Sequence, residues 1–512
     1  MNTNIRFRLP FLVFILLTSI LIASCTSQLK ESSPPNIIVF LVDDMGLMDT
    51  SVPIITDANG NVVKHPLNNY YKTPNMEKLA AQGVRFTNFY AHSVCSPTRT
   101  SILTGQNSAR HGVTNWIRSE SNNRTKFGPT NWNWKGLTMQ SVTLPRILKE
   151  AGYKTIHVGK AHFGPFDSEG EDPLNLGFDV NIAGSSIGQP GSYLGTEGFG
   201  HIGGNKTRAV PGLEKYHGKD IFLTEALTLE ANLAISQAKE ESKPFYLNMA
   251  HYAVHAPFYS DPRFEHHYKD SGKSEKAQAY ATLIEGIDKS LGDILQHVKD
   301  LGVGENTLIF FLGDNGSDAP LPIENDYSSS TPLKGKKGNH WEGGMRVPFI
   351  ASWVSPNEKV LSQEKLPIPS NAIQQQMGSI LDIFPTLCRV ANVNAPEGFV
   401  IDGFELHDQL MGKQNEIRDE SFLNHFPHSH RSNYFTSLVK SEWKIIYHYP
   451  IEDQPRYELF NLKNDPFESK NVADENPEQL TMMMKVLSDE MKSKKALYPE
   501  KEERTLELVM PN

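Results

Sequence analysis

Apolar, β-rich runs alternate along this chain with segments whose apolar positions recur every three or four residues. The runs predict strands at 36–42, 84–90, 154–158, 245–249, 307–312 and 347–353, and the unbroken apolar character of 36–42 is typical of a strand covered on both faces. Helical periodicity and capping residues predict helices at 73–82, 96–103, 144–151, 221–238 and 275–301. This alternation predicts an α/β domain with a large, mostly parallel sheet sandwiched by helices.

The pattern changes near residue 418. Short apolar runs at 435–440, 443–449 and 457–461 predict antiparallel strands, and a helical pattern follows at 475–494. We therefore expect a main domain over 36–415 and a smaller C-terminal subdomain over 416–512, which contains a short antiparallel sheet and a helix.

The N-terminus carries a targeting pattern. Arg6 and Arg8 precede an apolar run at 11–22, which is short for a membrane-spanning helix, and small residues then lead to Cys25. This order resembles a bacterial lipoprotein signal over 1–24, which implies cleavage and a lipid on Cys25. A plain secretory signal with an unrelated cysteine is the alternative. We expect 25–35 to be a tether, and the protein to be exported and anchored to a membrane of the periplasm or to the outer membrane.

Composition narrows the class of protein. The chain has 512 residues, of which 38% are hydrophobic and 21% charged, and this suits a folded protein with a sizeable core. The net charge is −9 and no basic block stands out, so nothing supports a surface that binds nucleic-acid phosphates, and we expect no nucleic-acid partner. Three cysteines give no disulfide framework, and Cys388 lies in an apolar stretch that predicts a core position.

The segment Cys95-Ser96-Pro97-Thr98-Arg99 is followed by Leu103-Thr104-Gly105. Here the chain resembles the formylglycine-dependent sulfatases of the alkaline phosphatase-like superfamily. The resemblance implies that a maturation enzyme oxidises Cys95 to an aldehyde, whose hydrate has one hydroxyl to attack sulfur and another to expel sulfate. It also implies that Arg99, one turn along the helix, fixes and polarises this group. The helix N-terminus itself favours an anion.

Two acidic pairs follow predicted strands. Asp43-Asp44 comes after 36–42 and Asp314-Asn315 comes after 307–312. Taken singly, each pair could be a turn or a helix cap. The resemblance implies that they and the modified Cys95 bind a divalent metal. Oxygen ligands suit Ca²⁺ or Mg²⁺, and the family resemblance favours Ca²⁺, although the sequence does not choose between them.

Three further segments match the family and supply cations. In Gly159-Lys160-Ala161-His162-Phe163-Gly164 the resemblance implies that Lys160 binds sulfate and His162 contacts the diol, while Ala161 replaces a family tryptophan at the pocket wall. In the segment 251–258 it implies that His255 donates a proton to the leaving oxygen; His251 is more consistent with a structural role. Aligning Glu342-Gly343-Gly344 places the family's sulfate-binding lysine at Lys337, and leaves Lys334 and Lys336 as solvated basic residues.

The segment 424–431 is rich in histidine. We expect His425, His428 and Arg431 either to bind sugar hydroxyls or a second anionic group at the rim of the site, or to be solvated loop residues. The resemblance implies a sulfated glycan as substrate, with exo-action on algal polysaccharide fragments favoured over host glycosaminoglycan or mucin glycans. A phosphodiesterase or phosphonate hydrolase of the same superfamily, and an inactive glycan-binding lipoprotein, are the alternatives.

Overall fold

The strand β1, Asn36–Val42, lies at the centre of the main sheet and is buried on both faces. Ile38, Phe40 and Val42 contribute to one apolar cluster, while Ile37, Val39 and Leu41 contribute to the other. The alternation of side chains along a strand explains why an unbroken apolar run is needed here. This is the arrangement that the sequence predicts for 36–42.

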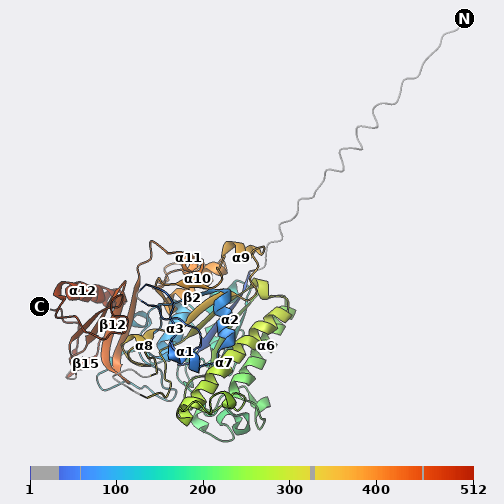
Figure 1. Ribbon diagram of the computed structural model, residues 1–512, viewed down its shortest axis with the longest axis horizontal. Coiled ribbons are helices and arrows are strands. Elements are labelled where there is room, and N and C mark those ends of the chain that lie inside the picture. The colour runs from blue at the N-terminus through green and yellow to red at the C-terminus, as the bar shows by residue number, and fades with distance from the viewer. Residues whose placement is uncertain (2–33, 58, 323–328, 452–454, 512) are drawn as a thin grey trace. The chain divides into compact units, whose positions relative to one another are not determined.

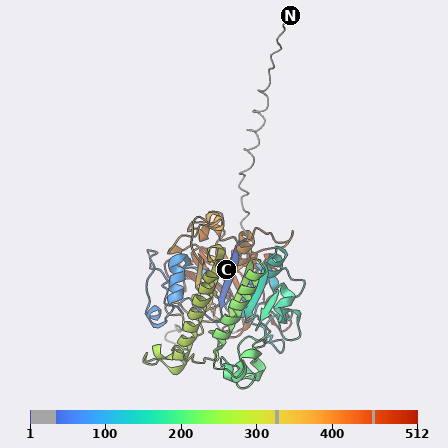
Figure 2. The ribbon, with the colours of Figure 1, turned by 90° about the vertical axis from the view of Figure 1, so that its right-hand side faces the viewer.

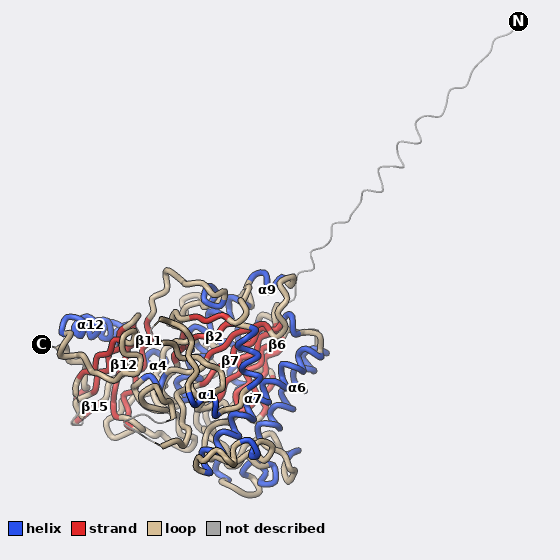
Figure 3. The backbone as a smooth tube through the Cα atoms, in the orientation of Figure 1, coloured by secondary structure: helices blue, strands red, loops and turns tan. Residues whose placement is uncertain are grey.

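The computed structural model describes residues 1, 34–57, 59–322, 329–451 and 455–511, shown as ribbon and tube (Figures 1 and 3). The predicted signal and Cys25 lie outside the described residues. No described helix is long and apolar enough to cross a membrane.

The main sheet has the order β5-β4-β6-β1-β7-β8-β2-β9, in which all strands run parallel except β8. Its strands are β1, β2 (Val84–Phe86), β4 (Lys154–Gly159), β5 (Val180–Ile182), β6 (Phe245–His251), β7 (Thr307–Gly313), β8 (Phe349–Trp353) and β9 (Ala372–Gln374). The mostly parallel sheet is confirmed.

Helices cover both faces of this sheet. The helices that precede the C-terminal sheet are α1 (Pro66–Tyr70), α2 (Pro74–Gln82), α3 (Cys95–Thr104), α4 (Ser108–His111), α5 (Leu144–Glu150), α6 (Leu223–Glu240), α7 (Glu275–Asp300), α8 (Glu342–Met345), α9 (Leu361–Lys365), α10 (Ile383–Val390) and α11 (His407–Leu410). Helices α2, α6 and α7 pack on one face, where α6 and α7 lie side by side (Figure 2). Helices α3, α5 and α10 pack on the other, and Cys388 is buried there.

One predicted strand is divided in two. The run 84–90 bends at 87–88, so that β2 joins the main sheet while β3 (Phe89–Tyr90) pairs with β10 (Gly378–Ser379). The amide of Thr87 donates to the carbonyl of Gln374, and that of Gly378 donates to the carbonyl of Asn88. The bend aims the chain from the sheet toward α3, which carries Cys95.

The C-terminal part forms an antiparallel sheet of β11 (Ser421–Ser429), β12 (Asn433–Lys440), β13 (Trp443–His448) and β14 (Tyr457–Asn461). Helix α12 (Pro477–Ser493) packs on one face through Met484 and Leu487, and a hairpin of β15 (Glu500–Lys501) and β16 (Arg504–Thr505) follows. On the other face, Phe426 and Ile446 cluster with Val94, directly before Cys95. This sheet therefore supports the site as well as closing the fold.

A buried ion cluster joins this sheet to the main domain. Lys444 of β13 places its Nζ 2.9 Å from an oxygen of Glu342 on α8 and 2.7 Å from one of Glu468, and all three side chains are fully buried. Since an unpaired charge is costly in such a place, the cluster makes the position of α8 depend on the C-terminal sheet.

Candidate active site

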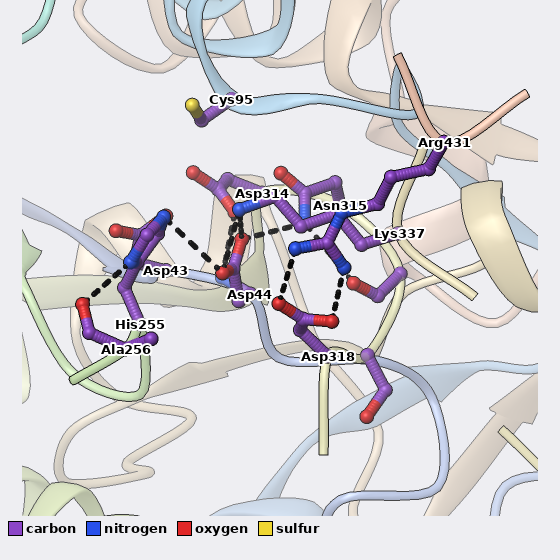
Figure 4. A network of polar contacts seen from close by, with 12 residues as sticks. Asp43, Asp44, Cys95, His255, Ala256, Asp314, Asn315, Asp318, Lys337 and Arg431 are labelled. Atoms are coloured by element: carbon purple, nitrogen blue, oxygen red, sulfur yellow. Dashed lines mark hydrogen bonds and ion pairs between the residues drawn. The ribbon is translucent and has the colours of Figure 1, made fainter. Parts of the chain in front are cut away.

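Cys95 is the first residue of α3, at a buried helix N-terminus. The helix lies entirely inside the protein and ends at Gly105, whose left-handed φ of 66° needs a residue without a Cβ. Burial raises the pKa of the Cys95 thiol above its ordinary value, so the unmodified thiol stays protonated at neutral pH. Cys95 lies next to the polar network of Figure 4.

The acidic pairs meet beside Cys95, because β1 and β7 are adjacent parallel strands and end at the same edge of the sheet. Ligand oxygens of Asp43, Asp44 and Asp314 lie within 4.8 Å of one another, and all three carboxylates are fully buried. Asn315 donates from Nδ2 to Asp44 Oδ1 at 3.0 Å. Asp44 has a φ of 59°, an uncommon conformation outside glycine that places its carboxylate in the group.

This group of oxygens fits a hard divalent cation. The Oδ1 atoms of Asp43 and Asn315 are buried without a hydrogen-bond partner among the described residues, although buried polar atoms are normally satisfied. Three carboxylates and one amide oxygen suit Ca²⁺ or Mg²⁺, which prefer oxygen ligands, and lack the nitrogen or sulfur atoms typical of zinc sites. The residues therefore form a possible metal site.

Three cations surround the carboxylates. Lys160 Nζ lies 2.7 Å from Asp43 Oδ2, and Lys337 Nζ lies 2.7 Å from both oxygens of Asp44. Arg99 Nε donates to Asp314 Oδ2 at 2.9 Å, and its Nη1 donates to the carbonyl of Lys160 at 2.7 Å. The site thus places fixed positive charge on every side of its acidic centre.

These charges shift the carboxyl groups in different directions. Burial raises the pKa of Asp314 to about 6, with the charge of Asp43 adding to the rise and that of Arg99 opposing it. Burial would also raise the pKa of Asp44, yet the charges of Lys337, His255 and Lys160 together hold it well below its ordinary value. Asp44 is therefore the carboxylate that stays ionised most firmly.

His162 contacts Cys95 in a defined tautomer. Its Nε2 lies 2.6 Å from the carbonyl oxygen of Ile117, which can only accept, so Nε2 carries the proton. Nδ1 is then the acceptor, 3.4 Å from Cys95 Sγ and 3.3 Å from Ser96 Oγ. Burial, assisted by the charge of Lys160, lowers the pKa of His162 well below its ordinary value, which keeps the ring neutral.

The structure separates the two histidines of the segment 251–258. His255 places Nε2 3.6 Å from Asp44 Oδ2, donates from Nδ1 to the carbonyl of Ala256 at 2.8 Å, and lines the cavity at Cys95. Burial and the charge of Lys337 lower its pKa to about 3. His251 is fully buried and pairs with Ser290 Oγ at 2.9 Å, as expected of a structural residue.

A cavity of about 190 Å³ opens onto Cys95. Cys95, His162, His255 and Lys337 line it, whereas Lys334 and Lys336 do not. Four further residues line it that no sequence motif marked: Trp116, Ser119, Gln189 and Arg208. They lie in irregular segments, with Arg208 at the end of a short 3-10 helix (Lys206–Arg208), where neither periodicity nor a local motif could single them out.

Of the histidine-rich segment 424–431, His430 and Arg431 line the cavity. Arg431 lines the cavity and donates to both oxygens of Asp318, from Nη2 at 2.7 Å and also from Nη1. The expectation that His425 and His428 reach the rim is wrong. They lie on β11, are 1% and 0% exposed, and bond to Thr436 and Thr114. Ala161 is also buried in the core, away from the pocket wall.

Comparison with known proteins matches this arrangement to one family. The model of the family described as Sulfatase matches residues 35–393, and that described as "N-sulphoglucosamine sulphohydrolase, C-terminal" matches 339–496. The N-acetylgalactosamine-6-sulfatase of Canis lupus familiaris is 33% identical over 74% of this chain and 67% of its own length. A sulfatase of Formosa agariphila is 29% identical over 92% of this chain and 90% of its own.

Solved structures share the fold. The crystal structure of Ps i-CgsB has a TM-score of 0.69 at 24% identity and covers 90% of this chain and 93% of that chain. A sulfatase from a glycosaminoglycan-metabolism locus of Bacteroides thetaiotaomicron has a TM-score of 0.65 at 25% identity and covers 90% of this chain and 100% of that chain. With the site described above, these matches show that the chain belongs to the sulfatase family of the alkaline phosphatase-like superfamily and is a sulfuric ester hydrolase.

Proposed function

We propose that this protein hydrolyses sulfate monoesters on sulfated sugars, with formylglycine made from Cys95 and a divalent metal, Ca²⁺ by preference. The observation that carries the proposal is a group of three buried carboxylates, each paired with a buried cation, beside a cavity that Cys95 and Lys337 line. A sulfate ester is a poor electrophile, so its hydrolysis needs an activated nucleophile and stabilisation of the charge that develops on oxygen.

The metal would be held by Asp43, Asp44, Asp314, Asn315 and the modified Cys95, and would supply a Lewis acid for the sulfate oxygens. The hydrated aldehyde would supply an attacking hydroxyl and a second hydroxyl whose deprotonation releases sulfate. Arg99, fixed by Asp314, orients this residue one helical turn away.

Lys160 and Lys337 bind the sulfate oxygens. Burial opposes the charge of Lys337, yet Asp44 raises its pKa above the ordinary lysine value, so it remains charged. Both ammonium groups are positioned in advance by their carboxylate partners, which limits the reorganisation needed when the anion arrives.

The two histidines move protons. His255 protonates the leaving alcohol oxygen. Burial and Lys337 lower its pKa, and the negative charge of a bound sulfate ester would raise it, because a nearby anion favours the imidazolium. His162 accepts a proton through Nδ1 from the hydroxyl on residue 95, as its tautomer requires.

The substrate class rests on the cavity wall and on the relatives. Trp116 offers an apolar face for a sugar ring, and Arg208 and Arg431 offer donors for hydroxyls or a second anionic group. Related proteins are named N-acetylgalactosamine-6-sulfatases, and neighbouring structures contain k-i-k-neocarrahexaose or D-glucosamine-2-N,6-O-disulfate. We favour exo-action on sulfated algal oligosaccharides, ahead of glycosaminoglycan and mucin fragments.

The proposal includes the maturation of Cys95 and the location of the protein. A formylglycine-generating enzyme must act on Cys95 before the protein is active. The N-terminal pattern supports export and lipidation at Cys25, with the enzyme anchored in the periplasm or at the outer membrane. Globomycin-sensitive processing and labelling with a palmitate analogue would test this; normal processing and no label would leave a plain secretory signal.

The test of function is sulfate release by protein made with a maturation enzyme. The panel contains sulfated carrageenan oligosaccharides, N-acetylgalactosamine-6-sulfate, glucosamine-2-N,6-O-disulfate, and paired aryl sulfate and aryl phosphate esters. The proposal predicts sulfate release from a saccharide and faster turnover of the aryl sulfate, both abolished by Cys95→Ala. Faster turnover of the aryl phosphate would favour the phosphodiesterase alternative, and saccharide binding without turnover would favour an inactive binding protein.

A further inference from the structure

A second group of potential metal ligands lies apart from the carboxylates of the active site. His340 precedes α8, His448 ends β13, and Glu458 lies on β14. One ligand atom from each of these residues lies within 4.8 Å of the other two. Nothing in the proposed sulfatase reaction uses them.

The unusual member is His340. It is 5% exposed, and both of its ring nitrogens lack a hydrogen-bond partner among the described residues. A buried imidazole normally satisfies at least one nitrogen, because an unpaired buried polar atom costs about 1–3 kcal/mol. Its ring packs against His448, with centroids 4.8 Å apart, and its Nε2 lies 3.7 Å from Glu458 Oε1.

The spacing suits one small ion. Glu458 Oε1 also lies 2.7 Å from His448 Nε2. In tetrahedral zinc sites, with ligand bonds of about 2.0–2.2 Å, neighbouring ligand atoms are about 3.3 Å apart. The distances from Glu458 Oε1 to Nε2 of His448 and of His340, 2.7 and 3.7 Å, fall on either side of this value. Movement of the side chains by about half an ångström would bring both separations to this value.

The charges near the group are compatible with a cation. Glu458 brings a carboxylate to the group, and Lys444 and Lys334 are the lysines nearby. Lys444 is itself paired with two glutamates, which offsets most of its charge.

We propose that His340, His448 and Glu458 form a second metal site, distinct from the catalytic one, which takes a transition-metal ion of the Zn²⁺ class. Two imidazoles and one carboxylate are a ligand set that zinc accepts and that Ca²⁺ and Mg²⁺ disfavour. This inference does not rest on the proposed function.

A metal at this site would hold in place the loop that carries Lys337, which lines the cavity. Lys337 lies three residues before His340, and the amide of the intervening Gly338 donates to the carbonyl of Ser93 at 2.7 Å. A metal shared by His340 and the strands β13 and β14 would hold this loop on the C-terminal sheet, and so fix Lys337 from its C-terminal side.

The experiment measures metal content and stability of the full chain with Ca²⁺ in excess. Protein is equilibrated with Zn²⁺, dialysed and analysed for bound zinc; Co²⁺ is used in parallel for the visible absorption of its tetrahedral complexes. We expect about one tight zinc equivalent, and a melting temperature that rises with zinc concentration. His340→Phe keeps the ring packing without nitrogens, and Glu458→Gln keeps an acceptor for His448; both should lose the zinc and the cobalt bands.

The matched control is a surface group of similar composition. His266 and His267 are adjacent, and His267 lies 2.8 Å from Glu285. The double variant H266N/H267N should keep the tight equivalent. The proposal is overturned if wild-type protein retains no zinc, if His340→Phe and Glu458→Gln retain as much as wild type, or if the control variant is the one that loses it.

Discussion

Lys337 is the residue whose replacement probes the site most selectively. Its Nζ lies 2.7 Å from both oxygens of Asp44, in a fully buried environment. At that distance a unit charge pair interacts by about 6 kcal/mol for an effective dielectric constant of about 20, before desolvation is subtracted. Removing one preorganised donor to a developing anion costs ~2.7–4 kcal/mol, so Lys337→Met should lower kcat by ~10²–10³-fold.

The assay is steady-state hydrolysis of an aryl sulfate by matured protein with saturating Ca²⁺. Lys336→Met is the matched control, because Lys336 is the adjacent lysine and does not line the cavity. Its kcat/KM should stay within about twofold of wild type, as for most surface changes. Near-normal kcat in Lys337→Met, or an equal loss in Lys336→Met, would refute the assignment of the sulfate-binding lysine.

Three other predictions concern stability and metal. Lys444→Met removes the lysine that pairs with two buried glutamates and should lower the free energy of unfolding, measured by urea titration, by about 3–5 kcal/mol. The control Lys463→Met removes an exposed ion pair and should change the same free energy by less than about 1 kcal/mol. Gly159→Ala should lower the free energy of unfolding by about 1–3 kcal/mol more than Gly152→Ala does in the same titrations. Both glycines have a positive φ, but only at Gly159 would an added Cβ lie 2.0 Å from the carbonyl oxygen of Ala250. Chelation should abolish sulfate release, and added Ca²⁺ should restore it. The circular dichroism spectrum should not change, because three cations offset the charge of the carboxylates. Sulfate release that survives a chelator would show that the reaction does not need the metal.

The parts of the fold that the sequence predicts are those with strong local patterns. β1 and β7 appear as unbroken apolar runs because each is buried on both faces, and α7 appears through its long amphipathic repeat. The division of 84–90 between two sheets is not predictable in this way. Both halves are apolar, and what separates them is pairing with β9 and β10, nearly 300 residues away.

The same difference between local patterns and long-range packing applies to the residues of the candidate site. Cys95, Lys160 and Lys337 are carried by short contiguous motifs, so their positions along the chain can be assigned before any geometry is known. His425 and His428 are misassigned because a segment dense in histidine resembles a ligand-binding rim or a solvated loop. The strand β11 is instead buried along most of its length, and these two imidazoles bond to partners within the fold. Trp116 and Arg208 reach the cavity only through the packing of distant loops.

The proposed mechanism depends most directly on the oxidation of Cys95 to formylglycine. Mass spectrometry of the peptide that contains Cys95, on protein made with and without a maturation enzyme, should be paired with sulfate release by the same samples. We predict an aldehyde in place of the thiol in the matured sample, activity in proportion to the aldehyde fraction, and none in Cys95→Ala. Undiminished sulfate release from protein whose Cys95 is entirely unmodified would contradict the central claim.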